Sequence, residues 1–182
     1  MSKKYKFHNP DGIYFITLTI TDWVDLFTKP EYSNIVLNSL KFCQENKGLV
    51  LHAWCIMPSH LHLIVSRNGN KSLSEIIRDF KRFTSIEIVK NINKSNDSRK
   101  NWMIDRFKVS AEKIKRVQHF KVWQDGNHPV EFDSNELLDQ RLEYTHQNPV
   151  KSFFVWEAED YVYSSAIDYA GEKGLLDIDP IN

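Results

Sequence analysis

Residues 49–66, LVLHAWCIMPSHLHLIVS, restrict the possible fold more than any other segment. Two apolar runs are separated by Pro58 and Ser59, a pair typical of a turn, so the pattern predicts two neighbouring antiparallel strands. His60 and His62 open the second strand. Because side chains two positions apart on a strand project to the same face, we expect the two imidazoles to lie side by side.

Strand and helix patterns surround this hairpin. Residues 12–21 alternate in the manner of a central strand that is covered on both faces. Helical periodicity spans residues 31–48, which end at a glycine, and residues 71–92, for which Ser72 or Ser74 is the predicted N-cap.

The second half of the chain is less regular. Residues 93–117 are polar and basic and predict a connection with one short helix, and residues 119–125, HFKVWQD, predict a fourth strand. Residues 133–149 predict a further helix that ends near Asn148, because Pro149 disfavours helical geometry in the residue before it.

The order strand, helix, strand, strand, helix, strand predicts an α+β fold. It is a split β-α-β unit with an antiparallel sheet and helices on one face. At 182 residues the chain has the length of one domain, and we assign residues 1–182 to a single domain.

Composition predicts a soluble, cytoplasmic protein. No apolar stretch approaches the roughly 20 residues that span a bilayer. The N-terminal lysines precede no apolar run of the kind found in secretory signals, and Cys43 and Cys55 are the two cysteines of the sequence, which fits a reducing compartment.

Charge is unevenly distributed although the net charge is zero. Residues 71–121 contain 14 Lys and Arg against 6 Asp and Glu, whereas residues 122–182 contain 3 against 13. The two regions form either self-neutralising faces or a basic phosphate-binding surface with an acidic counterface.

His60 and His62 are candidate ligands of a divalent metal ion, the alternative being strand histidines satisfied by hydrogen bonds. A third ligand is available on the last predicted helix, where Tyr144 and Asn148 are four residues apart and share a face. Two imidazoles and an amide oxygen leave positions open for phosphate oxygens, which suits Mg²⁺ or Mn²⁺. Tyr144 beside such an ion is a candidate nucleophile on phosphorus, the alternative being a packing aromatic.

Four segments, MPSHLHLIV (57–65), FKVWQDGNH (120–128), YTHQNPVK (144–151) and DYVYSSAIDY (160–169), resemble one protein family. They are similar to the REP-associated tyrosine transposases and the related single-tyrosine insertion-sequence transposases of the HUH endonuclease superfamily. The resemblance extends from about Gly12 to Tyr169.

The resemblance implies a ferredoxin-like core with an extra C-terminal helix that carries the tyrosine. It implies a transposase that cuts and rejoins single-stranded DNA, with His60, His62 and an amide one turn beyond the tyrosine holding the metal. Tyr144 would attack a phosphodiester and leave a 5′-phosphotyrosine and a free 3′-hydroxyl. Both Gln147 and Asn148 are available as the amide, and helical geometry favours Asn148.

Three other residues near the tyrosine segment are expected to have no catalytic role. His146 is expected to pack or to lie at the surface, and Tyr161 and Tyr163 are expected to pack against the sheet.

Single-stranded DNA with a hairpin is the partner that the resemblance implies, and a location at the nucleoid follows from it. Insertion-sequence relatives act as dimers that exchange the tyrosine helix, whereas REP-associated relatives can act as monomers, so the sequence leaves open whether the protein forms a homodimer. Candidate phosphate contacts are Arg78, Lys81, Arg82, Lys108, Lys113, Lys115 and Arg116. Trp102, Phe107 and Trp123 are candidates either for stacking on bases or for the core.

Two alternatives to the nuclease remain. One is a DNA-hairpin-binding protein in which cleavage is weak or lost. The other is a small metalloprotein unrelated to DNA, which would show no salt-dependent affinity for DNA.

Overall fold

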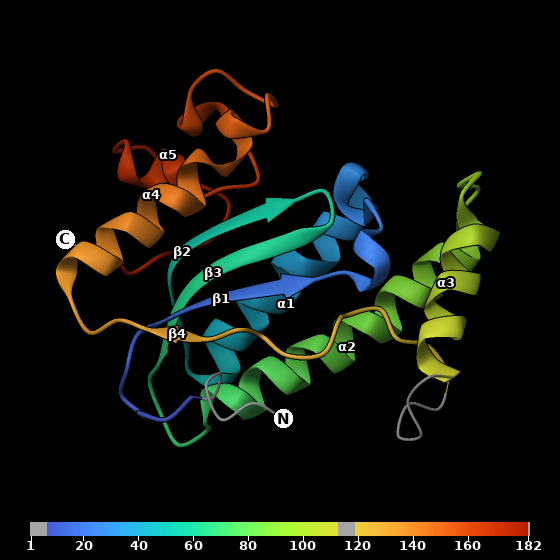
Figure 1. The fold of residues 1–182 in the computed structure, drawn as a ribbon, viewed down its shortest axis with the longest axis horizontal. Coiled ribbons are helices and arrows are strands. Elements are labelled where there is room, and N and C mark those ends of the chain that lie inside the picture. The colour runs from blue at the N-terminus through green and yellow to red at the C-terminus, as the bar shows by residue number, and fades with distance from the viewer. Residues whose placement is uncertain (1–6, 113–118, 182) are drawn as a thin grey trace.

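The first predicted strand lies in the centre of a four-stranded antiparallel sheet (Figure 1). A computed structural model describes residues 7–112 and 119–181. The strand order is β2-β3-β1-β4. The strands are β1 (Tyr14–Thr19), β2 (Leu49–Met57), β3 (His60–Arg67) and β4 (Val130–Glu131).

Helices cover both faces of this sheet. They are α1 (Pro30–Lys47), α2 (Leu73–Lys94), α3 (Lys100–Glu112), α4 (Asn135–Lys151) and α5 (Ala166–Tyr169), with single 3-10 turns at Thr21–Trp23, Leu26–Thr28 and Ala158–Asp160. Figure 1 shows α1 and α2 on one side of the sheet and α4 on the other. The predicted α+β, ferredoxin-like architecture is confirmed, and the described helices include none long and apolar enough to cross a membrane.

Local sequence explains where α1 and α2 begin and end. Pro30 occupies the first turn of α1, and Gly48 ends it in the left-handed conformation. Of the two serines considered for α2, Ser72 is the N-cap: its Oγ accepts a hydrogen bond from the backbone N–H of Glu75, whose carboxylate accepts one from the backbone N–H of Ser72.

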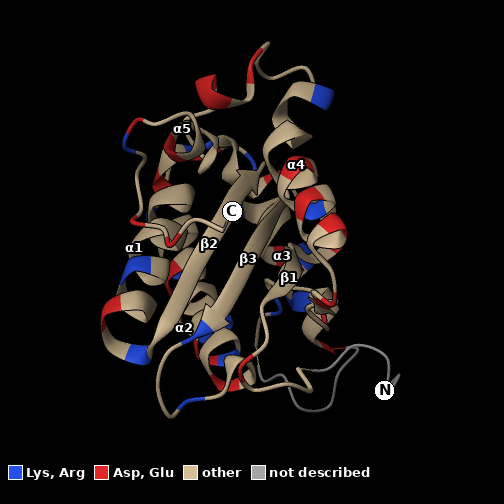
Figure 2. Ribbon diagram, turned by 90° about the vertical axis from the view of Figure 1, so that its left-hand side faces the viewer, with Lys and Arg blue, Asp and Glu red and all other residues tan. Residues whose placement is uncertain are grey.

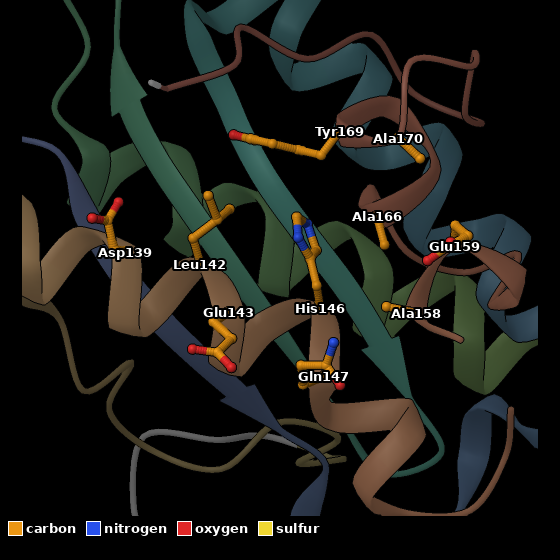
Figure 3. Close-up of a pocket in the computed structure, with 10 residues that line it drawn as sticks. All are labelled: Asp139, Leu142, Glu143, His146, Gln147, Ala158, Glu159, Ala166, Tyr169 and Ala170. Atoms are coloured by element: carbon orange, nitrogen blue, oxygen red, sulfur yellow. The ribbon is translucent and has the colours of Figure 1, made fainter. Parts of the chain in front are cut away.

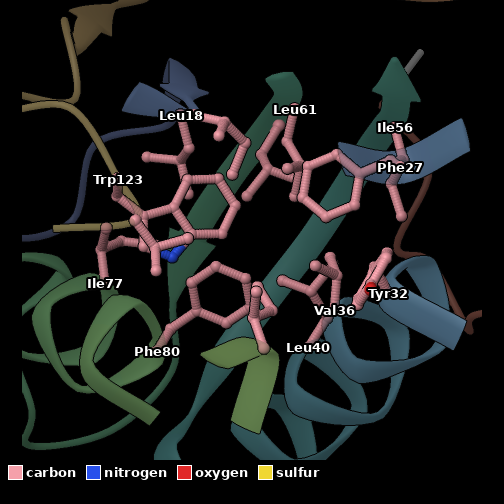
Figure 4. Packing of buried hydrophobic residues seen from close by; sticks show 14 of the residues in the cluster. Leu18, Phe27, Tyr32, Val36, Leu40, Ile56, Leu61, Ile77, Phe80 and Trp123 are labelled. Atoms are coloured by element: carbon pink, nitrogen blue, oxygen red, sulfur yellow. The ribbon is translucent and has the colours of Figure 1, made fainter. Parts of the chain in front are cut away.

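The main core fills the space between the sheet and the helices α1 and α2 (Figure 4). Phe80 and Trp123 lie with ring centroids 6.0 Å apart, and the indole N–H of Trp123 donates to Thr84 Oγ1 at 2.9 Å. A smaller cluster around Phe15, Ala53 and Ile64 lies on the opposite face, under α4.

The predicted fourth strand at residues 119–125 is wrong. One bridge, between Trp123 and Ile20, joins this segment to the sheet, and the backbone N–H of Lys121 donates to Phe107 in α3 instead. On one side of Trp123 the backbone of Lys121 bonds to α3, and on the other the carbonyl of Gln124 accepts from Lys81 of α2, so pairing with the sheet is confined to the bridge at Trp123. The fourth strand is the short β4, which pairs with Tyr14 and Phe15.

The predicted end of the last helix is also wrong, because α4 passes through Pro149 and ends at Lys151. Proline in the last turn removes one backbone donor and leaves the following hydrogen bonds intact. The backbone N–H of Ser152 donates to Asn148 at 3.0 Å, and that of Phe154 donates to Pro149 at 2.9 Å.

Gly48 provides a stability prediction, because its φ is +73° and an added Cβ would lie 1.8 Å from the carbonyl oxygen of Asn68. We expect Gly48→Ala to lower the free energy of unfolding by more than about 2 kcal/mol in urea denaturation. Gly171→Ala is the matched control, since its φ is +94° but nothing lies within 4 Å of the added carbon. Equal losses in the two variants would contradict the role of the clash.

Candidate active site

His60 and His62 lie side by side on the sheet face that α4 covers. His60 pairs with Thr19 of β1 and His62 pairs with Thr17, and the ring centroids of the two histidines are 4.7 Å apart. His62 is buried, and His60 is partly exposed. The predicted arrangement of the two imidazoles is therefore present.

Both ring nitrogens of His62 have partners. Thr17 Oγ1 lies 3.0 Å from Nδ1, and Asn148 Nδ2 lies 3.1 Å from Nε2. Because an amide nitrogen can only donate, Nε2 accepts and Nδ1 carries the proton, which it donates to Thr17. This tautomer directs the lone pair of His62 toward α4.

The surroundings keep both histidines neutral at pH 7. Burial lowers the pKa of His62 to about 3, with smaller effects from the neighbouring His60 and from the positive charge of Arg141. Burial also lowers the pKa of His60, and the nearby Asp25 carboxylate opposes this shift. Neutral imidazoles are the form that binds metal ions.

Helix α4 brings Tyr144 to the histidines. Its N-terminus is capped by Ser134, whose Oγ accepts from the backbone N–H of Leu137 at 3.3 Å. The ring centroid of Tyr144 lies 5.0 Å from that of His62 and 6.0 Å from that of Phe15, and the side chain is 38% exposed. The phenol is thus held beside the histidines yet accessible from solvent.

The two candidate amides face different sides of α4. Asn148 contacts His62, whereas Gln147 lines a pocket of about 510 Å³ together with Glu143 and His146 (Figure 3). Side chains one position apart on a helix point about 100° apart, which separates the two. Of the two amides, Asn148 is therefore the one that lies beside the histidines.

The donor set of the site suits a divalent ion that also binds substrate oxygens. Within residues 7–112 and 119–181, no group of three or more His, Cys, Asp or Glu side chains is arranged to hold a metal. The set consists instead of His60, His62 and the amide of Asn148. Rotation of this amide by 180° puts Oδ1, which can bind a cation, in the place of Nδ2. Two neutral nitrogens and one oxygen leave coordination positions for substrate oxygens.

His146, Tyr161 and Tyr163 pack as predicted. His146 is buried with Nε2 2.9 Å from Ser165 Oγ, and the hydroxyl of Tyr161 donates to the carbonyl of Ile56 at 2.9 Å. The carbonyl of Tyr163 accepts from the backbone N–H of Ile56. These residues fasten the C-terminal segment to β2.

His146 makes stability depend on pH. Burial lowers its pKa from the ordinary 6.5 to about 4, so the unfolded chain binds more protons between these values. We expect the free energy of unfolding to fall as the pH drops from 6.5 to 4, and His146→Gln to make this dependence shallower. Urea denaturation at pH 7.5 and 4.5 measures both; an equally steep fall in the variant would contradict the assignment.

The predicted DNA contacts on α2 lie across the sheet from the histidines, because α2 packs on the other face (Figure 1). Arg78 and Arg82 are exposed. Lys81 differs, because its ammonium donates to the carbonyls of Gln124 at 2.7 Å and Gly126 at 3.2 Å, and burial lowers its pKa to about 8. Lys81 therefore holds a loop beside β1.

The remaining predicted contacts divide into three groups. Lys108 is exposed on α3, while Lys113, Lys115 and Arg116 lie outside the described residues. Phe107 and Trp123 are buried in the core. Trp102 is exposed and lies 5.9 Å from the Arg106 guanidinium, so it alone of the three aromatics is accessible to a base.

Two residues that border the site were not predicted from the sequence: Thr17, which bonds to His62, and Arg141, whose guanidinium carbon lies 5.2 Å from the centroid of the Phe15 ring. Alternation along residues 12–21 places Thr17 on the same face as Phe15, which was a usable signal. Arg141 precedes Tyr144 by three residues and therefore shares its flank of the helix.

Comparison with known families identifies the chain. A family model described as IS200-like transposase matches residues 13–113, more than half of the sequence, including both histidines. The chain belongs to the IS200-like transposases.

Two proteins that are similar to this IS200-like transposase are both described as REP-associated tyrosine transposases. A Haemophilus influenzae protein named as a REP-associated tyrosine transposase is 25% identical over 155 residues, which are 85% of this chain and 79% of that protein. A solved structure of a REP-associated tyrosine transposase bound to a REP hairpin covers all of this chain and 94% of that one, with a TM-score of 0.62 and 18% identity. The second likeness establishes a shared fold.

Proposed function

We propose that this IS200-like transposase cuts and rejoins single-stranded DNA through a covalent 5′-phosphotyrosine bond at Tyr144. One observation carries the proposal: the accessible phenol of Tyr144 lies beside His62, whose acceptor nitrogen faces Asn148 on the same helix. A nucleophile next to two neutral imidazoles and an amide suits attack on a phosphodiester.

The reaction exchanges one phosphoester for another. The Oη of Tyr144 bonds to phosphorus, the bond from phosphorus to the 3′-oxygen breaks, and the 3′-oxygen takes up a proton. A 3′-hydroxyl of a second strand can then attack the phosphotyrosine and release Tyr144. Because each step keeps one phosphodiester bond, no external energy source is required.

His60, His62 and Asn148 are the residues that would hold Mg²⁺ or Mn²⁺, which when bound would supply a Lewis acid for the phosphate oxygens. Thr17 fixes the tautomer and the orientation of His62. Phe15 stacks on the ring of His62 at 5.4 Å and limits its movement. These contacts keep the site ordered before DNA arrives.

Hairpin-containing single-stranded DNA is the proposed substrate, and the nucleoid within the cytoplasm is the proposed place of action. The proposal is supported by the fold shared with a REP-associated transposase whose structure contains a REP hairpin, together with the exposed cation Lys108 on α3. Tyr144 and His62 of one chain are already neighbours, which supports chemistry within a single copy and leaves a homodimer unnecessary for the reaction.

The test is a covalent adduct. The protein is incubated with Mn²⁺ and labelled single strands from the DNA flanking its gene, and the products are separated on a denaturing protein gel. We expect label to migrate with the protein in Mn²⁺ or Mg²⁺ but not in EDTA. Tight binding of a hairpin without a covalent label would support the binding-only alternative, and absence of any salt-dependent DNA binding would contradict both.

A further inference from the structure

Three side chains with distinct chemistry follow one flank of α4. Arg141, Tyr144 and Asn148 occupy positions i, i+3 and i+7, which align along a helix. The last two belong to the candidate site already described. Arg141 takes no part in the metal site or in the attack of Tyr144 as proposed above.

Arg141 is fixed close to the nucleophile. Its guanidinium carbon lies 5.2 Å from the centroid of the Phe15 ring. The same ring is stacked on His62 at 5.4 Å and contacts Tyr144 edge-on at 6.0 Å. One aromatic ring therefore joins the cation to both groups of the site.

Arg141 has no anionic partner. In the part of the chain that the structure describes, no ion pair or side-chain hydrogen bond engages its guanidinium, and its Nε is buried without an acceptor. Other partly buried cations differ: Lys47 pairs with Asp79 at 2.7 Å, and Lys81 donates to carbonyls. A buried donor without an acceptor is costly, which indicates that an acceptor arrives from outside.

The missing partner is conspicuous because the surroundings are acidic. Residues 122–182 contain 13 Asp and Glu and only three basic residues, of which Arg141 is one. Figure 2 shows acidic residues along α4. The nearest in sequence, Asp139 and Glu143, line the pocket on the other flank (Figure 3) and leave Arg141 unneutralised.

We propose that Arg141 binds a non-bridging oxygen of the phosphodiester that Tyr144 attacks. The inference rests on the proposed function and adds to it a binding residue for the scissile phosphate. As the Oη–phosphorus bond forms and the bond to the 3′-oxygen breaks, negative charge grows on the non-bridging oxygens. A guanidinium held against Phe15 can meet that charge with a planar pair of donors without prior rearrangement.

The first test compares a charged with a neutral scissile phosphate. Wild type, Arg141→Ala and Arg141→Lys are assayed for adduct formation at saturating DNA on three strands. One strand is natural, and the other two carry at the cleavage position one or the other diastereomer of a methylphosphonate, in which a methyl group replaces one non-bridging oxygen. We expect Arg141→Ala to slow the natural reaction about 100-fold and Arg141→Lys to restore part of the rate. With the diastereomer that lacks the contacted oxygen, wild type and Arg141→Ala should react equally fast.

Arg106→Ala is the matched control, since Arg106 lies over Trp102 on α3 in a similar cation-π contact. We expect this variant to keep the wild-type rate at saturating DNA on every strand. If Arg141→Ala lowers the rate of adduct formation by the same factor on all three strands, Arg141 has only a structural role and the proposal is wrong. If it lowers the rate on none of them, the proposal is also wrong.

The second test needs no cleavage. In the Tyr144→Phe background and in EDTA, the affinity for the same strand is measured by fluorescence anisotropy over a range of salt concentrations. Loss of one phosphate contact in Arg141→Ala should reduce the slope of log affinity against log salt by about 0.7. An unchanged slope would overturn the proposal, whereas a reduced slope without any wild-type adduct would overturn the proposed function and leave Arg141 as a phosphate ligand.

Discussion

Replacing Tyr144 with phenylalanine will abolish the covalent protein–DNA adduct and leave hairpin binding within a few-fold of wild type. The phenol oxygen is the atom that bonds to phosphorus, so we expect the adduct rate to fall by more than about 1,000-fold. Phenylalanine keeps the ring that packs against His62 and Phe15, so the geometry of α4 should persist. The measurement is the labelled adduct on a denaturing gel beside the dissociation constant for a hairpin.

Tyr163→Phe is the matched control for this prediction. Tyr163 is also partly exposed, its ring centroid lies 6.5 Å from that of Tyr161, and it packs against the main core. We expect its adduct yield to equal that of wild type. An adduct that persists in Tyr144→Phe, or that disappears in Tyr163→Phe, would assign the nucleophile elsewhere.

The second large effect is expected at the two histidines. The double variant His60→Ala with His62→Ala removes two of three proposed metal ligands, so we expect adduct formation to become undetectable and Mn²⁺ binding to be lost. Titration calorimetry with Mn²⁺ in the absence of DNA measures the metal separately from the reaction. Full Mg²⁺-dependent cleavage by the double variant would contradict the metal site.

His52→Ala separates metal binding from folding. His52 is a buried strand histidine whose ring contacts Asp179 O and Ser66 Oγ, both at 2.7 Å, and it lies on β2 rather than in the site. We expect it to lower stability while Mn²⁺ binding is retained in the folded protein. Thr17→Val provides a graded intermediate, since loss of the hydrogen-bond partner of Nδ1 should weaken metal binding about 10- to 100-fold.

Local patterns were sufficient for much of the fold. Alternation along residues 12–21 predicted a central strand that is covered on both faces, and β1 does lie inside the sheet, between β3 and β4. The spacing of His60 and His62 placed the imidazoles on one face, and Gly48 ended α1. Each of these depends on backbone geometry within a few residues, which sequence periodicity reports directly.

Other features depended on distant residues. Residues 119–125 have the composition of a strand, yet the backbone groups on either side of Trp123 bond to α3 and to Lys81 of α2, so pairing is confined to one bridge. Pro149 lies within α4 because only the last turn of the helix follows it. Propensity gives way to tertiary packing in the first case and to position within the helix in the second.

The sequence alone therefore identified the candidate residues His60, His62, Tyr144 and Asn148 and showed which of them share a face of a strand or a helix. The tertiary structure decided which elements face each other. It brought Asn148 rather than Gln147 to Nε2 of His62 and Thr17 to Nδ1 of the same ring. It also placed the guanidinium of Arg141 over the ring of Phe15. The physical reason is that periods of 2.0 and 3.6 residues fix side-chain directions locally, whereas the docking of α4 on the sheet depends on apolar contacts between segments far apart in the chain.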